Sequence, residues 1–150
     1  MIEKIKTNKF KLIAGILVVL IALFTLKLFN DYRERNLADL INVNSSDFVN
    51  MRIVTPEGNM WTEEIQHVDE LLQVFNQYQV KRISQNEFQN QHNDKKIYTT
   101  FEVRIQKNSG AIILHVFETD FIWLNLNFYK VLNGPIEEER LRTYFENHES

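Results

Sequence analysis

The chain contains no cysteine among its 150 residues, and it has only four glycines, two prolines and four histidines. Without cysteine, a disulfide scaffold, a thiolate metal site, a cysteine nucleophile and a lipid-modified cysteine anchor are all excluded. The sequence also lacks a glycine-rich phosphate loop, a G-x-S-x-G elbow and an H-E-x-x-H zinc motif. Its length suits one folded domain with an appendage, since a domain takes roughly 100–200 residues.

A long apolar run near the amino end is the most informative feature that is present. Residues 10–29 read FKLIAGILVVLIALFTLKLF, and between Lys11 and Lys27 no residue is charged and only Thr25 is polar. A bilayer core about 30 Å thick needs about 20 mainly apolar residues in a helix. The two flanking lysines can extend their charges toward the headgroups. We therefore predict a transmembrane helix over residues 10–29, in contact with the lipid bilayer.

Two other interpretations of this run fit it less well than an anchor does. A buried core helix normally carries a polar stripe, and none is present here. A cleaved signal peptide ends in small residues, whereas residues 24–29 read FTLKLF and are bulky except for Thr25. An uncleaved, single-pass signal anchor fits the run best.

The distribution of charge predicts orientation and excludes one class of partner. Lysines are concentrated before the run, whereas basic residues after it are interleaved with acidic ones. Because cytoplasmic flanks are enriched in lysine and arginine, we expect residues 1–9 to be a cytoplasmic tail and the carboxyl-terminal domain to be extracytoplasmic. Beyond residue 29 the chain carries 12 basic and 19 acidic residues, a net charge of −7. An acidic domain binds nucleic acid poorly, so no nucleic-acid partner is expected.

The segment after the anchor, residues 30–47, is expected to be a stalk and linker. Apolar side chains within residues 37–41 share one face at helical spacing, which predicts that the membrane helix continues to Val43. The polar residues 42–47 are turn-prone and form the linker. We place the extracytoplasmic domain over residues 48–150.

Alternation of apolar and polar residues predicts a domain built largely from strands. The clearest strand covers residues 97–107, where Phe101, Val103 and Ile105 face one way. Apolar stripes after Thr62 and after Pro135 predict two helices that pack on the sheet. The fold class is α+β, an antiparallel sheet with two packed helices in the order β-β-α-β-β-β-β-β-α. The expected strands begin at Phe48 and Met60 and continue with residues 80–83, 97–107, 111–119, 121–125 and 128–132.

Two regions are candidates for contact with a partner. Residues 84–96 are almost wholly polar and are expected to form a loop, which is either functional or simply mobile. Aromatic residues on the predicted strands either pack in the core or form a recognition face, because exposed Trp and Tyr anchor interfaces. The candidate binding residues are Trp61, Tyr98, Phe117, Phe121, Trp123 and Tyr129.

Candidate catalytic groups are few. His115 and Glu102 face each other across a predicted hairpin and could serve as a base and its orienter, but a strand histidine also has a purely structural interpretation. His92 and Asp94 supply too few ligands for a metal site. The clustered glutamates lie at predicted helix starts, where the helix dipole explains them. We therefore assign no catalytic residue, no metal ligand and no cofactor.

The layout of anchor, stalk and small sheet domain resembles the single-span extracytoplasmic proteins of unknown function from low-GC Gram-positive bacteria. The strand, PEGN turn, strand and helix of residues 48–77 are similar to a unit found in many such domains. The resemblance implies a location at the cell membrane and no particular activity. A type IV pilin-like protein is a poorer match, because Lys9 precedes Phe10 and Ala14 occupies the fifth position, where pilins have Glu.

These observations favour a non-catalytic, membrane-anchored binding module of the bacterial cell envelope. Its partner would be another envelope protein or a peptide, bound through the aromatic face or through residues 84–96. Two alternatives stay open: an envelope-acting enzyme that uses His115 and Glu102, and a structural subunit of a membrane or pilin-like assembly. The span contains Gly15 but no pair of small residues at the spacing that helix packing in membranes favours.

Overall fold

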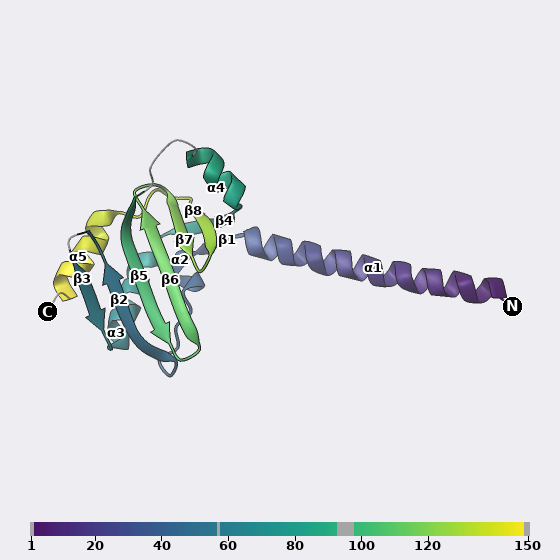
Figure 1. Cartoon of the computed structure of the whole chain (residues 1–150), viewed down its shortest axis with the longest axis horizontal. Helices are drawn as coiled ribbons and strands as arrows, with labels where there is room; N and C mark the ends of the chain where they lie inside the picture. The colour runs from purple at the N-terminus through teal and green to yellow at the C-terminus, as the bar shows by residue number, and fades with distance from the viewer. Residues whose placement is uncertain (1, 57, 93–97, 149–150) are drawn as a thin grey trace. The chain divides into compact units, whose positions relative to one another are not determined.

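The computed structural model of the chain describes residues 2–56, 58–92 and 98–148, and the chain divides into two units at Arg33. The first unit is helix α1, Ile2–Tyr32 (Figure 1). Within it, the 20 residues Ile13–Tyr32 are long and apolar enough to cross a membrane, and none of this stretch is buried. At 1.5 Å per residue these residues extend about 30 Å, the thickness of a bilayer core. This exposure agrees with a membrane anchor or a signal sequence and differs from that of a core helix.

The second unit, Glu34–Ser150, contains an eight-stranded sheet in which every neighbouring pair is antiparallel. The strand order is β1-β4-β8-β7-β6-β5-β2-β3. The strands are β1 (Glu34–Asn36), β2 (Phe48–Val54), β3 (Asn59–Thr62), β4 (Gln79–Ile83), β5 (Thr99–Lys107), β6 (Gly110–Phe117), β7 (Phe121–Leu124) and β8 (Asn127–Val131). The predicted α+β class with an antiparallel sheet is confirmed.

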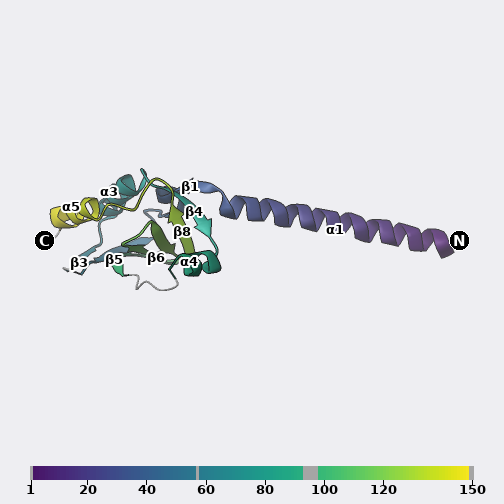
Figure 2. The same ribbon diagram turned by 90° about the horizontal axis from the view of Figure 1, so that it is seen from above.

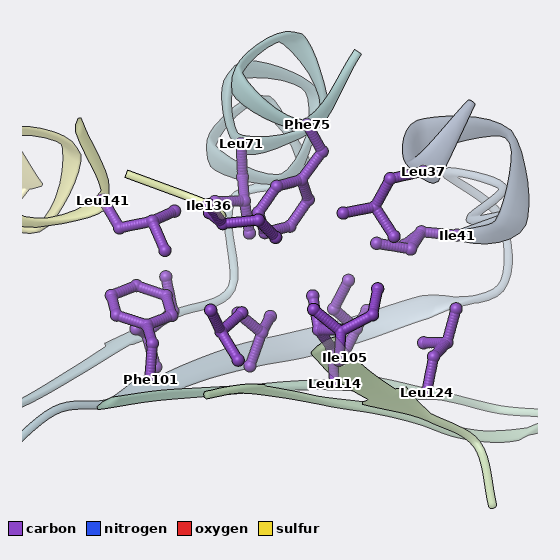
Figure 3. Packing of buried hydrophobic residues seen from close by; sticks show 14 of the residues in the cluster. Leu37, Ile41, Leu71, Phe75, Phe101, Ile105, Leu114, Leu124, Ile136 and Leu141 are labelled. Atoms are coloured by element: carbon purple, nitrogen blue, oxygen red, sulfur yellow. The ribbon is translucent and has the colours of Figure 1, made fainter. Parts of the chain in front are cut away.

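Three helices cover one face of this sheet and enclose the core. They are α2 (Leu37–Leu40), α3 (Ile65–Phe75) and α5 (Glu138–His148). Figure 2 shows α3 and α5 on the same side of the strands, and Figure 3 shows Leu37 of α2 on that side as well. Leu71 and Phe75 of α3 point toward Phe101 and Leu114 of the sheet (Figure 3). We call this side of the sheet the core face.

The period-two pattern of the sequence accounts for the core face. Phe101, Val103 and Ile105 of β5 are each at most 2% exposed, as their alternation predicts. The apolar stripe of α3 is also buried in the core: Val68, Leu71 and Phe75 are all 0% exposed. Burying such side chains contributes about 1.5–3 kcal/mol each relative to leaving them in water.

The tight turn between β5 and β6 is tied to the start of β2. Lys107 pairs with Gly110 across the turn, and Gly110 has a φ of +139°, a conformation that suits glycine. Asp47 accepts a 3.0 Å hydrogen bond from the Ser109 backbone N–H and a second bond from the Ser109 hydroxyl. These bonds from Ser109, with the nearby Lys107 ammonium, lower the pKa of the Asp47 carboxyl.

The predicted stalk over residues 30–47 is wrong in its structure and its boundary. Helix α1 ends at Tyr32, and the chain then enters the sheet as β1, which pairs with β4. The apolar face that suggested a continuing helix is buried in the core, where Leu37 is 0% and Ile41 is 2% exposed. Burial of these side chains outweighs helix continuation, so the sheet domain begins at Glu34 rather than at Phe48.

The predicted loop over residues 84–96 is wrong for most of its length. Residues Gln85–His92 form helix α4, and the Ser84 hydroxyl accepts the Glu87 N–H at 3.1 Å at its start. Residues 93–96 lie outside the part of the chain that the structure describes. With α2 and α4, the described part of the domain contains four helices, two more than the sequence pattern predicts.

Candidate functional site

The sheet has a second face, opposite the core face, and helix α4 covers only one part of it. In Figure 1 the strands β5 and β6 lie in front of α3 and α5, so this second face points toward the viewer. The Phe88 ring of α4 stacks on the Phe128 ring with their centroids 4.2 Å apart. It also lies 5.7 Å from the Phe121 ring and 6.0 Å from the Phe117 ring. The aromatic residues of β6, β7 and β8 thus hold an otherwise polar helix in place through Phe88.

The other part of the second face is not covered by any helix within residues 34–56, 58–92 and 98–148. A row of side chains crosses four strands here: Trp61 is opposite Arg52, Arg52 is opposite Arg104, and Arg104 is opposite Ile113. Trp61 is 57% exposed, and both arginines are exposed as well. We define the open face by the residues Arg52, Trp61, Arg104, Ala111, Ile113, Trp123 and Leu126.

A hollow of about 340 Å³ lies at the end of the open face nearest the β7–β8 hairpin. Its lining is mostly apolar and consists of Ala111, Ile113, Trp123, Asn125 and Leu126. This volume is at the lower end of the range for small ligands, which is roughly 300–1,000 Å³. It is large enough to receive one apolar side chain of a partner.

The tip of the β7–β8 hairpin is held in an unusual backbone conformation. Asn125 has a φ of +46° and Leu126 a φ of +68°, the left-handed values of a two-residue hairpin turn in which Asn-Gly is preferred. Asn125 is bonded on both sides to Ile113: its N–H donates at 3.0 Å and its Oδ1 accepts at 2.9 Å. Leu126, at the glycine position, is 82% exposed. The chain therefore presents a large apolar side chain to solvent at a strained position.

Replacing Leu126 by glycine is expected to stabilise the domain by about 1 kcal/mol, because the left-handed conformation costs a leucine roughly 1–2 kcal/mol and glycine almost nothing. Urea unfolding followed by tryptophan fluorescence gives the free energy of unfolding of both chains. Leu126→Ala is the matched control, since alanine keeps the strain and removes only an exposed side chain. A glycine variant that is less stable than the alanine variant would contradict the prediction.

The residues considered for catalysis lie beside the open face but do not form a hydrogen-bonded pair. The His115 Nδ1 is 3.6 Å from the Glu102 Oε2, longer than a hydrogen bond. Glu102 also lies 3.4 Å from the Arg104 guanidinium, and the His115 ring stacks on Trp123 with centroids 4.8 Å apart. Among the described residues that line the hollow, neither His115 nor Glu102 is found.

The structure separates the aromatic residues proposed from the sequence. Trp61 and Trp123 lie on the open face, and Tyr98 is 55% exposed just before β5. Phe117 and Phe121 pack against Phe88 of α4, and Phe121 is only 2% exposed.

Tyr129 follows the core-packing alternative rather than the recognition-face alternative. It pairs with Ile122 and packs against the core, whereas Trp123 pairs with Phe128. The two-residue turn fixes this register, so Trp123 and Tyr129 lie on opposite faces of the sheet.

The remaining members of the open face were missed by sequence reasoning. Arg52 and Arg104 occupy polar positions of strands that alternate between apolar and polar residues, and nothing in the sequence distinguishes them from ordinary exposed side chains. They lie opposite each other because β2 pairs with β5, and this pairing is not evident from the sequence. The one signal in the sequence was the hairpin segment Asn125-Leu126-Asn127, in which a leucine stands where glycine is expected.

A cluster of aromatic and histidine rings joins α5 to α3 on the core face. The His67 and His148 rings lie 4.5 Å apart, and the Tyr144 ring stacks on His148 at the same distance. The His148 Nε2 is 2.7 Å from a Glu70 carboxylate oxygen, and the Tyr144 hydroxyl donates to the His67 carbonyl at 2.7 Å. Burial and the Glu70 charge raise the pKa of Tyr144 above its ordinary value. These contacts account for the docking of α5 on α3.

No group of three or more His, Cys, Asp or Glu residues is placed to hold a metal ion within the ranges that the structure describes. Comparisons with protein-family models, with curated proteins and with solved structures return no match. The fold and α1 together define an α+β protein with an amino-terminal apolar helix of the signal-anchor or signal-sequence kind.

Proposed function

We propose that this protein is a non-catalytic binding module held at the bacterial cell membrane by α1, with its amino terminus in the cytoplasm and residues 34–150 outside it. The exposed apolar stretch Ile13–Tyr32 carries this proposal, because an exposed apolar helix of that length is solvated far better by lipid than by water. The lysines that precede the apolar run support the orientation.

The open face supports binding as the activity of the domain. It combines two tryptophans, two arginines and an apolar hollow on a rigid sheet, and Trp and Arg are the residue types that dominate binding energy at interfaces. The partner we propose is another protein of the cell envelope or a peptide. No cofactor is needed for such a role.

The experiment places a photoreactive phenylalanine analogue at Ala111 of the full chain in intact cells. Ala111 is exposed and lines the hollow, so a bound partner should form a covalent adduct there. The same analogue at Glu146, an exposed position of α5 on the opposite side of the sheet, is the control. We expect an adduct at Ala111 only, and we expect Trp123→Ala to reduce it about tenfold, since loss of an interface tryptophan costs more than 1 kcal/mol.

Two results would contradict the proposed function. One is the absence of any adduct at Ala111 while the chain is present and folded in the membrane fraction. The other is protection of the domain from external protease in intact cells, combined with digestion after lysis, since that pattern places the domain in the cytoplasm.

A further inference from the structure

The open face carries a pair of like charges that no group in the described part of the chain neutralises fully. Arg52 and Arg104 stand directly opposite each other on β2 and β5, and like charges in that position destabilise a sheet. Arg104 has Glu102 at 3.4 Å, but Glu102 is shared with His115. The Arg52 guanidinium, by contrast, makes no hydrogen bond or ion pair with another residue in the described ranges of the chain, although its backbone is part of the sheet. The chain beyond residue 29 has a net charge of −7, so this basic pair is a local exception.

Apolar surface flanks the arginine pair on both sides. Trp61 lies next to Arg52 on β3, and Ile113 lies next to Arg104 on β6. Beyond Ile113 is the hollow whose far side is formed by Trp123 and the strained, exposed Leu126. The open face therefore runs from an apolar end, across two guanidinium groups, to an apolar hollow.

The width of the open face sets the length of the ligand that can cross it. From β3 to β7 there are four strand intervals, which at about 4.8 Å each give about 19 Å. An extended polypeptide advances about 3.3 Å per residue, so about six residues cross the open face.

We propose that the open face binds an extended acidic segment of a partner protein, about six residues long. A carboxylate of that segment lies between Arg52 and Arg104, and an apolar side chain enters the hollow beside Trp123. This inference rests on the proposed function and specifies the chemistry of its partner. Guanidinium groups bind carboxylates with paired hydrogen bonds, which gives orientation as well as affinity.

Two other occupants fit the open face less well. A second copy of the chain related by a two-fold axis brings the same patch against itself, which sets the arginine pair of one copy against that of the other. An anionic lipid surface attracts the arginines, but it repels the acidic remainder of the domain. A separate acidic segment meets neither difficulty.

The test uses the full chain in nanodiscs of neutral lipid and a phage-displayed library of random peptides about six residues long. Empty nanodiscs remove peptides that bind lipid. The chain has only two tryptophans, Trp61 and Trp123, and both lie on the open face, so the emission spectrum reports binding there. We expect the enriched peptides to combine Asp or Glu with a large apolar residue and to shift this emission.

Charge reversal tests the arginines directly. The double variant Arg52→Glu, Arg104→Glu should lower the affinity of the enriched peptides at least about tenfold, since truncating an interface arginine commonly costs more than 1 kcal/mol. Selection against this variant should enrich basic peptides instead. Arg142→Glu, on the exposed side of α5, is the matched control and should leave the affinity unchanged. Circular dichroism verifies that each variant is folded.

Several results would overturn the inference. These are enrichment of neutral peptides, enrichment of no peptide, or equal affinity before and after charge reversal. A shift in emission with phosphatidylglycerol vesicles but not with peptides assigns the open face to lipid, and a dimer lost on charge reversal assigns it to a second copy. Neutral peptides that shift the emission overturn only the acidic specificity, whereas a missing adduct at Ala111 in cells removes the proposed function itself.

Discussion

The full chain with Val19→Arg and Leu20→Arg is expected in the soluble fraction after alkaline carbonate extraction, whereas the unchanged chain stays with the membrane. These positions lie at the middle of the uncharged part of α1. Each arginine at the centre of a spanning helix costs about 3 kcal/mol on insertion scales, so the pair lowers membrane partition about 10⁴-fold. Fractionation followed by immunoblotting measures the distribution.

A matched control changes the same two positions without changing their polarity. Val19→Leu and Leu20→Val keep the run apolar and should leave the chain in the membrane fraction. The intact mass of the membrane-bound chain separates an anchor from a signal peptide, because cleavage after the apolar run would remove α1. Retention of the arginine variant in carbonate-washed membranes would show that α1 is not what holds the protein there.

Replacing Phe75 by alanine is expected to lower the free energy of unfolding of the domain by about 4 kcal/mol, because truncating a fully buried phenylalanine costs 3–5 kcal/mol in lost burial and in the cavity that remains. Phe75 is 0% exposed and extends from the last turn of α3 into the core (Figure 3). Domains are commonly stable by about 5–15 kcal/mol, so this single change removes a large part of the total.

Urea unfolding of the full chain in mild detergent, followed by tryptophan emission, measures this loss. Gln73→Ala changes an exposed residue two positions earlier on the same helix and should alter the free energy by less than about 0.5 kcal/mol. A loss below about 1 kcal/mol for the Phe75 variant would mean that α3 does not pack on the sheet as described.

The open face offers a physical reason to expect that stability and binding are separable in this domain. Leu126 holds an unfavourable left-handed conformation, and Arg52 and Arg104 repel each other, yet both features lie on a surface that none of the described helices covers. Strained or frustrated groups of this kind concentrate at functional sites, where a partner relieves the cost. Variants that relax either feature should therefore fold at least as well as the unchanged chain.

Features that depend on neighbouring residues along the chain were predicted from the sequence. The apolar run that forms α1 is recognised by length and composition alone, since the requirement to satisfy the backbone in lipid is local. The buried side of β5 follows from alternation along the strand. The stripe of α3 predicted which side chains enter the core.

Features that depend on residues far apart in the chain needed the structure. The polar segment after Ser84 becomes α4 because Phe88 packs on rings from β6, β7 and β8. Residues 34–41 belong to the sheet domain instead of a stalk, because β1 pairs with β4 and Leu37 is buried in the core. Tertiary burial overrides local preference in both cases.

The sequence by itself determined that the chain has one apolar helix suited to lipid and an α+β domain, because both follow from composition and periodicity along the chain. Only the tertiary structure decided which residues share the open face. Strand order placed Arg52 opposite Arg104, and hairpin register turned Tyr129 toward the core. The physical reason is that the order and register of the strands depend on which faces of the whole sheet become buried. The sequence of a single segment does not contain that information.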